Sequence, residues 1–291
     1  MSWRVVTVTN RCKLEHRLDY LVCRGEETVK IHLSEISVLI VESVAVAVTA
    51  SLLCELTRRK IKVIFCDEKH NPFFELVPTS LRYDTSGCLR KQIAWAEYNK
   101  QIIWTEIVRH KIYQQMLVLK KYGHQTQADM LFNYMADVRQ GDITNREGHA
   151  AKVYFNAVFG NDFTRQIATD TNAALDYGYS ILLSAFNREV AVNGYSANFG
   201  INHNNEYNHF NLSCDLMEPF RPFVDRTVLQ MDVKSFNKEH KHILQQLINK
   251  EVLFDNKKYS LNNAIGLYVK RVIYAIENGD VNALQFCGYE F

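Results

Sequence analysis

The stretch "IAWAEYNKQIIWTEIVRHKI", residues 93 to 112, lies where the pattern of the chain changes. Its apolar residues recur at helical spacing, which predicts an amphipathic helix. The same periodicity predicts helices over 126–138, 145–160, 170–190, 222–234, 239–250 and 260–278. From about residue 84 onward, we therefore expect a mainly helical structure.

Upstream of that stretch the chain alternates between apolar and polar residues and is rich in β-branched side chains, which is typical of strands. We expect short antiparallel strands in "WRVVTVTN" (3–10), "LDYLVCRG" (18–25), "ETVKIHL" (27–33) and "ISVLIV" (36–41). A helix entered at Ser43 is predicted over 43–60, and further strands over 61–67 and 71–78. The expected fold class is α+β, with a small β-rich, β-sandwich-like domain at 1–84 and an α-helical catalytic domain at 85–291.

The composition excludes several classes of protein. The 291 residues carry a formal net charge of +2, so the chain lacks the strong positive charge of many nucleic-acid-binding proteins, and any DNA contact must use local basic patches. The longest apolar run, residues 36–56, is interrupted by Glu42, Ser43, Thr49 and Ser51, so we expect no membrane segment. Seven cysteines without a C-x-x-C spacing or a secretory leader predict free thiols in a reducing, cytoplasmic compartment.

Four positions could carry chemistry: Glu147 in "NREGHAAKVYF", His203 in "GINHNNEY", and Asp215 and Glu218 in "CDLMEPFRP". Carboxylates with one imidazole can bind Mg²⁺ or Mn²⁺, and a mixed set of this kind can also hold Zn²⁺. Such an ion would polarise a phosphoryl oxygen during phosphodiester chemistry.

Each of these positions also has an ordinary structural explanation. Glu147 would favour the first turn of a helix, His203 could be a hydrogen-bonding loop residue, and Asp215 or Glu218 could cap a helix or pair with Arg221. The chain has no glycine-rich phosphate loop, no G-x-S-x-G and no H-E-x-x-H, so competing catalytic motifs are missing. From the residues alone, a metal site and a purely structural role both stay open.

Basic and aromatic residues near these positions could contact DNA. Arg146, Lys152 and Arg165 are the expected DNA contacts, and Arg221 could hold the scissile phosphate or orient Glu218. Tyrosines 154, 177 and 179 could stack on bases, but 15 tyrosines in the chain favour core packing instead.

Four blocks in order, "REGHAAKVYF", "NAALDYGYSILL", "GINH" and "DLMEPFRPFVDR", resemble the signature blocks of the CRISPR-associated integrase, the catalytic subunit of spacer acquisition. "CDEKHNPFFELVP" (66–78) resembles that family's N-terminal domain, and the wording is most like the type II-A branch. The resemblance implies that Glu147, His203 and Glu218 are the catalytic metal ligands for Mg²⁺ or Mn²⁺. It places Asp215 next to them as a supporting acid, although many relatives have aspartate where Glu218 stands.

The resemblance also implies a reaction and a set of partners. A 3′-hydroxyl of a foreign DNA fragment would attack the phosphodiester at the border of a CRISPR repeat, and water would replace that hydroxyl in endonuclease activity. The implied assembly is a heterohexamer in which two integrase homodimers flank one dimer of a small ferredoxin-like second adaptation protein, joined by further type II-A adaptation proteins. Domain 1–84 would serve dimerisation. The alternatives are a catalytically silent DNA-binding scaffold and a stand-alone metal-dependent phosphodiesterase.

Overall fold

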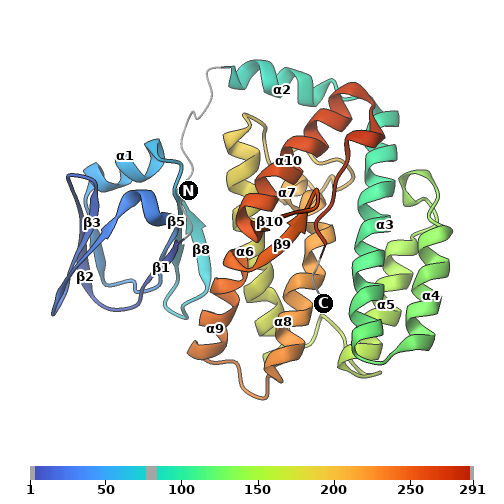
Figure 1. Cartoon of the computed structure of the whole chain (residues 1–291), viewed down its shortest axis with the longest axis horizontal. Coiled ribbons are helices and arrows are strands. Elements are labelled where there is room, and N and C mark those ends of the chain that lie inside the picture. The colour runs from blue at the N-terminus through green and yellow to red at the C-terminus, as the bar shows by residue number, and fades with distance from the viewer. Residues whose placement is uncertain (1–3, 77–83, 289–291) are drawn as a thin grey trace. The chain divides into compact units, whose positions relative to one another are not determined.

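The computed structural model describes residues 4–76 and 84–288. The chain divides into two compact units, Met1–Leu81 and Arg82–Phe291, which are described separately here (Figure 1). The first unit is rich in strands and the second is mainly helical, so the predicted α+β fold class is confirmed. The boundary at residue 84 and the dimerisation role of the first unit stay predictions. Parts of the predicted strands 3–10 and 71–78 lie outside the described residues.

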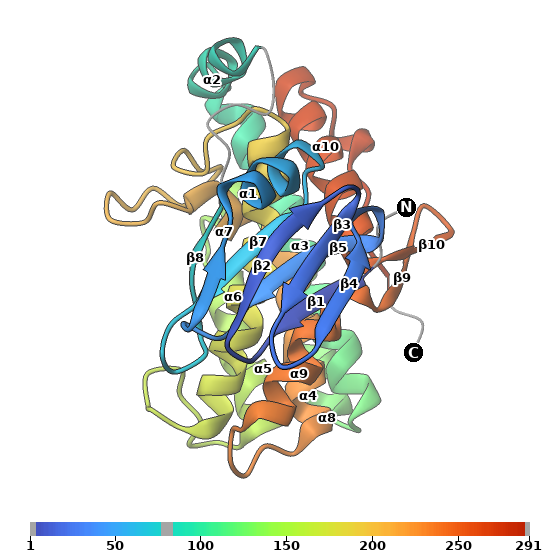
Figure 2. The same cartoon turned by 90° about the vertical axis from the view of Figure 1, so that its left-hand side faces the viewer.

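The first unit contains two four-stranded sheets (Figure 2). One sheet has the order β1 (Arg4–Val8), β5 (Ile36–Val41), β7 (Lys62–Cys66) and β8 (Pro72–Glu75). The other has the order β4 (Thr28–His32), β3 (Tyr20–Arg24), β2 (Cys12–Arg17) and β6 (Val46–Val48). A 3₁₀ turn, η1 (Leu33–Glu35), and helix α1 (Ala50–Arg58) complete the unit.

The two sheets share one apolar core. Every residue of β5 is buried, as expected for a strand with an almost continuous apolar sequence. Leu39 of β5 joins Leu14 of β2, Leu21 of β3, and Leu52 and Leu56 of α1 in the same cluster, and all five are almost completely buried. Since side chains from both sheets fill this core, the unit is sandwich-like, as predicted.

The direction of one predicted strand differs from our prediction. Of the four strands predicted to be antiparallel, β3 and β4 do pair in that way. The prediction is wrong for β5, which runs parallel to β1. Among the other pairs, β2–β3 and β7–β8 are antiparallel, whereas β5–β7 and β2–β6 are parallel. Parallel neighbours need long crossovers, and these are supplied here by the β2–β4 segment and by α1.

The predicted helix entrance at Ser43 is also wrong. Val46–Val48 forms β6, and α1 begins only at Ala50, after Thr49. The Thr49 hydroxyl accepts a hydrogen bond from the backbone N–H of Leu52, so Thr49 is the N-cap. Ser43 accepts instead from the N–H of Ala45. Strand β2 was not predicted, although Cys12, Lys13 and Leu14 show the burial alternation of a strand.

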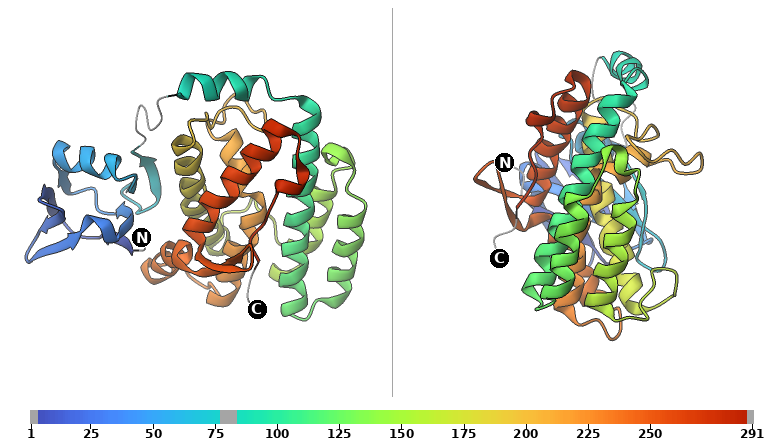
Figure 3. Two further views of the ribbon diagram at one scale, coloured as in Figure 1. Left: turned by 45° about the horizontal axis from the view of Figure 1, so that its top comes forward. Right: turned by 90° about the vertical axis from the view of Figure 1, so that its right-hand side faces the viewer.

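The second unit is built around two long helices, α3 and α6 (Figure 3). Its helices are α2 (Thr85–Ile93), α3 (Glu97–Lys121), α4 (Gln125–Ala136), α5 (Arg146–Phe159), α6 (Asp170–Val192), α7 (Asn211–Met217), α8 (Arg221–Met231), α9 (Lys238–Gln245) and α10 (Leu261–Asn278). Its 3₁₀ turns are η2 (Gln140–Asp142), η3 (Glu218–Phe220), η4 (Gln246–Asn249) and η5 (Val281–Ala283). A hairpin joins β9 (Glu251–Phe254) to β10 (Lys257–Ser260).

Most predicted helices of this unit match an observed one. Helices α2 and α7 and the β9–β10 hairpin were not predicted. The predicted helical stretch 93–112 is interrupted at 94–96, between α2 and α3, and the expected helix 239–250 ends as the 3₁₀ turn η4. Helix α3 packs against α4, α5, α8, α10 and η3, so it brings α5 and η3 to the same helix surface. In the described part of the chain, we find no helix long and apolar enough to cross a membrane.

Candidate metal centre

A strained loop places Glu147 in the first turn of α5. Asp142 accepts hydrogen bonds from the backbone N–H groups of Arg146, at 2.8 Å, and Glu147, at 3.0 Å. Asn145 caps the helix by accepting from the N–H of Gly148 at 3.2 Å. Both Asp142 and Asn145 have a φ of 52°, a conformation unfavourable for residues other than glycine. Such strain is kept where the surroundings enforce it, often next to functional groups.

The loop that carries His203 is wrapped around the carboxylate of Asp215. Asp215, on α7, is completely buried and accepts backbone N–H bonds from Ile201 at 2.6 Å, Asn202 at 2.9 Å and His203 at 3.1 Å. The Nδ1 of His203 lies 2.5 Å from Asp215 Oδ1. With four partners, this carboxylate has little capacity left for an ion, so Asp215 orients the loop and the imidazole. This geometry supports our prediction that Asp215 is a supporting residue.

The imidazole of His203 is influenced by the negative charges of Glu147 and Glu218. The hydrogen bond to Asp215 raises the pKa of His203, against the opposing effect of burial, and the charges of Glu218 and Glu147 act in the same direction. The ring also meets Trp104 edge-on, with centroids 5.9 Å apart. When Nδ1–H donates to Asp215, Nε2 is left as the acceptor, which is the usual arrangement of a metal-binding histidine.

Glu218 begins the turn η3 and is held by two cations. Its side chain is 4% exposed; Arg221 Nε donates to Oε1 at 2.8 Å and Lys111 Nζ donates to Oε2 at 2.5 Å. Burial acts to raise the pKa of Glu218, but Arg221 and Lys111 outweigh it and lower this pKa to about 2. The carboxylate is therefore ionised at neutral pH, and the predicted pairing with Arg221 is present.

Lys111 is the residue of this centre that our sequence reasoning missed. Its ammonium contacts Glu147 Oε1 as well as Glu218 Oε2, each at 2.5 Å, so the two oxygens lie at most twice that distance apart. Burial lowers the pKa of Lys111, but the two glutamates outweigh that effect and raise it. Its position in the sequence could have identified it, because Lys111 lies beside Ile107, Val108 and Ile112 on the buried face of α3. A charged side chain is rarely buried there unless it is paired.

The donor chemistry of this centre fits a divalent cation. Glu147 and Glu218 already hold one cation, the ammonium of Lys111, and they lie near enough to His203 for their charges to raise its pKa. The ring of His203 is in turn bonded to the carboxylate of Asp215. Among the residues that the structure describes, no three His, Cys, Asp or Glu side chains converge closely enough to coordinate one ion. Lys111 lies between the two glutamates instead.

The predicted DNA contacts are not in this centre. Arg146 pairs with Asp137 and lies over the ring of Tyr134, while Arg165 pairs with Asp176 and with Asn172. Lys152 is exposed on α5. A role of Arg146, Lys152 and Arg165 in DNA binding stays a prediction.

The three tyrosines are core residues, as favoured by their number. Tyr154, Tyr177 and Tyr179 are buried. The hydroxyl of Tyr179 donates to the buried carboxylate of Asp225, and the guanidinium of Arg221 lies 4.7 Å from the centre of the Tyr179 ring. Burial raises the pKa of Asp225 to about 6, against the opposing effect of hydrogen bonds from Tyr179 and Tyr154. Tyr179 therefore supports the guanidinium that holds Glu218.

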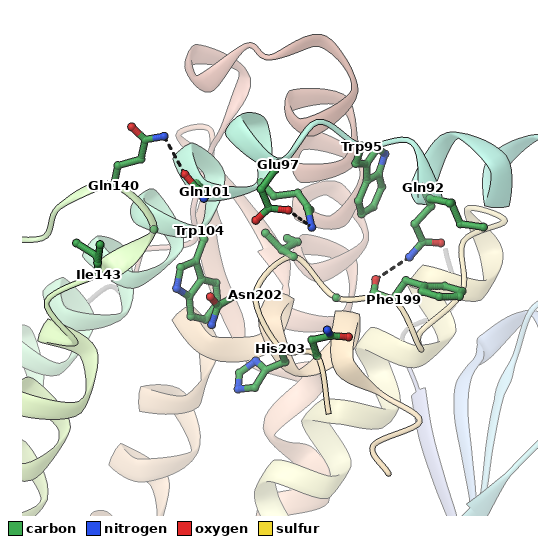
Figure 4. A pocket seen from close by; sticks show the side chains of 16 residues that line it. Gln92, Trp95, Glu97, Gln101, Trp104, Gln140, Ile143, Phe199, Asn202 and His203 are labelled. Carbon is green, nitrogen blue, oxygen red and sulfur yellow. Dashed lines mark hydrogen bonds and ion pairs between the residues drawn. The ribbon is translucent and has the colours of Figure 1, made fainter. Parts of the chain in front are cut away.

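A pocket of about 570 Å³ opens beside His203 (Figure 4). Figure 4 shows Trp104 and His203 close together, with Gln101 and Gln140 linked by a hydrogen bond on one side. On the other side, Gln92 donates to the carbonyl of Phe199 at 2.8 Å and holds the loop that leads to His203. The pocket gives solvent and ligands a route to the imidazole.

Comparison with known proteins identifies the family of this chain. The family described as "CRISPR associated protein Cas1" matches residues 5–253. The "CRISPR-associated endonuclease Cas1" of Neisseria meningitidis serogroup C (strain 8013) is 35% identical over 232 residues, which cover 79% of this chain and 76% of that protein. The chain belongs to the Cas1 family, and the resemblance seen in its sequence is confirmed; the type II-A assignment stays a prediction.

Two solved structures share the fold at low sequence identity. A chain of a Cas6-RT-Cas1–Cas2 complex matches with a TM-score of 0.72 and 17% identity, over 97% of this chain and 36% of that longer one. A casposase bound to integration product matches with a TM-score of 0.68 and 16% identity, over 96% of this chain and 91% of the casposase.

Proposed function

We propose that this chain is a metal-dependent DNA endonuclease and integrase that inserts foreign DNA fragments into a CRISPR array. The observation that carries the proposal is the pair of carboxylates, Glu147 and Glu218, held on one cation beside an imidazole oriented by Asp215. The printed name of the Neisseria relative, an endonuclease, and the fold shared with a casposase bound to integration product support it.

Glu147, Glu218 and Nε2 of His203 would hold Mg²⁺ or Mn²⁺. When bound, that ion supplies charge stabilisation for the phosphodiester oxygens during the displacement. Arg221 keeps Glu218 Oε1 in place, and Asp215 fixes the imidazole of His203 through its Nδ1, which leaves Nε2 for the ion. Asp142 holds the first turn of α5, which carries Glu147.

The reaction proposed for this centre is a transesterification. The 3′-oxygen of the incoming fragment forms a new bond to the phosphorus at the repeat border, and the bond from that phosphorus to the 3′-oxygen of the cut strand breaks. One phosphodiester replaces another, so the reaction needs positioning and charge stabilisation but no nucleotide cofactor. The same displacement with water as the nucleophile is endonuclease cleavage.

The proposed partners follow from the family. They are DNA, a second copy of this chain, and the small ferredoxin-like second adaptation protein, in a heterohexamer of two integrase dimers and one partner dimer, with further type II-A adaptation proteins. The fold shared with a chain of a Cas1–Cas2 complex supports the second adaptation protein as a partner. The proposed compartment is the cytoplasm.

A strand-transfer assay tests the proposal. The purified protein and its partner are incubated with a branched DNA substrate and Mn²⁺ or Mg²⁺. We expect Glu147→Gln, His203→Ala and Glu218→Gln each to abolish product while circular dichroism shows a folded protein. Glu239→Gln is the matched control, because Glu239 is also in a first helical turn but is exposed, and it should retain full activity.

Two outcomes would replace the proposal. If the wild-type protein forms no product with either metal, the chain is better described as a DNA-binding scaffold. If it cleaves a simple phosphodiester faster than DNA, it is better described as a stand-alone phosphodiesterase.

A further inference from the structure

We infer that Lys111 is a tethered cation that competes with the divalent ion for Glu147 and Glu218, and so sets the metal affinity of the centre. This inference rests on the proposed metal site. Three features support it: the position of the lysine, the division of the Glu218 oxygens between two cations, and the charge balance of the buried cluster.

The position of Lys111 is that of a bridging cation. Its Nζ lies 2.5 Å from Glu147 Oε1 and 2.5 Å from Glu218 Oε2. Mg²⁺ and Mn²⁺ bind oxygen at about 2.0–2.2 Å, so an ion shared by the same two oxygens would need nearly the same place. The ammonium and the ion cannot both occupy it.

The two oxygens of Glu218 are divided between the two cations that contact it. Arg221 Nε binds Oε1 at 2.8 Å, whereas Lys111 binds Oε2, the oxygen that faces Glu147. Arg221 can therefore keep its contact when an ion binds Oε2. Lys111 is the cation that has to leave.

The charge balance gives the reason for competition. Glu147 and Glu218 carry two negative charges, and Lys111 and Arg221 carry two positive charges, so this cluster is neutral. The Lys111 and Glu218 side chains are 10% and 4% exposed, so water screens these charges poorly. A divalent ion that joined the neutral cluster would leave uncompensated positive charge, which withdrawal of the ammonium relieves.

Removing the lysine should therefore strengthen metal binding, whereas a side chain that binds the two glutamates more tightly than lysine should weaken metal binding. Isothermal titration of the full chain with Mn²⁺ alone tests both signs. We expect Lys111→Met to lower the Kd for Mn²⁺ by at least about tenfold. Lys111→Arg, whose guanidinium can bind carboxylates in a bidentate manner, should raise the Kd several-fold. Lys120→Met is the control, because Lys120 is an exposed lysine of the same helix, and it should leave the Kd unchanged.

Thermal unfolding gives a second readout. Without Lys111 the two glutamates repel each other, so Lys111→Met should melt at a lower temperature than the wild type in metal-free buffer. Saturating Mn²⁺ should raise its melting temperature by more than it raises that of the wild type. If Lys111→Met cannot be recovered folded, the weaker binding expected of Lys111→Arg decides the question.

The failure of this inference differs from the failure of the proposed function. If Glu147→Gln abolishes Mn²⁺ binding but Lys111→Met binds no more tightly than the wild type, the competition is refuted and the metal site stands. If Mn²⁺ binding by the wild type is absent, or is unchanged by Glu147→Gln and Glu218→Gln, the proposed metal site fails and the role of Lys111 fails with it.

Discussion

The most informative single perturbation is Gly200→Ala, because Gly200 begins the loop that wraps the carboxylate of Asp215. A Cβ at this position would lie 2.3 Å from the carbonyl oxygen of His203 and 2.6 Å from Asp215 Oδ2. Both distances are well below van der Waals contact; one neighbour is the loop backbone and the other is the carboxylate on α7 that the loop binds. The loop or the carboxylate would have to move.

The magnitude follows from that displacement. Overpacking of a well-packed interior costs about 1–3 kcal/mol, and each N–H bond to the buried carboxylate that is broken adds about 1.5–3 kcal/mol. With one such bond broken, we therefore expect Gly200→Ala to lower the free energy of unfolding by roughly 2.5–6 kcal/mol. Strand transfer should fall as well, because the imidazole of His203 moves with the loop.

Urea denaturation and the strand-transfer assay measure the two effects. Gly87→Ala is the matched control, since a Cβ there meets no atom within 4 Å and Gly87 lies in helix α2. That substitution should stabilise the protein by about 0.5–1 kcal/mol. If Gly200→Ala keeps both the stability and the activity of the wild type, the loop does not position His203 in the way described here.

Three further predictions concern the surroundings of the centre. Because the pKa of Asp225 is raised in the folded state, that state binds the proton of Asp225 more tightly than the unfolded state does. The free energy of unfolding of the wild type should therefore fall as the pH rises from about 4 to about 6. Urea denaturation at several pH values measures this decline, and Asp225→Asn should remove it. Tyr179→Phe removes one of the two tyrosine hydroxyls that bond Asp225 and should destabilise the protein by about 1–3 kcal/mol in the same denaturation experiment. A loss below about 0.5 kcal/mol would contradict the buried hydrogen bond. Lys152→Gln should weaken DNA binding and reduce the slope of log K against log salt by about one in a fluorescence anisotropy titration, and an unchanged slope would remove Lys152 from the DNA contacts.

Local sequence signals predicted those parts of the fold that depend on neighbouring residues. The apolar periodicity that predicts a helix over 260–278 lies wholly within the segment that forms α10, so this helix was predicted closely. The direction of β5 relative to β1 and β7 was not predictable in this way, because alternation is the same in parallel and antiparallel strands. The entrance of α1 depended on a choice between Ser43 and Thr49, two residues with similar capping chemistry.

The candidate metal centre, like the fold, could be predicted only in part from local sequence. Glu147, His203 and Glu218 could be proposed from residue type and family resemblance, but their geometry depends on long-range contacts. Lys111 is 107 residues before Glu218, and nothing in the local pattern of α3 links the two. The supporting role of Asp215 was expected only from the family resemblance, because its partners are backbone N–H groups of the 201–203 loop, which almost any residue type would supply.

An anomalous difference map from crystals of this protein soaked in Mn²⁺ tests the proposed metal site most directly. We expect one strong peak about 2.0–2.2 Å from a carboxylate oxygen of Glu147, from Oε2 of Glu218 and from Nε2 of His203, with the ammonium of Lys111 withdrawn. A map without a peak there, with Lys111 still bridging the two glutamates at saturating Mn²⁺, would contradict the proposed site.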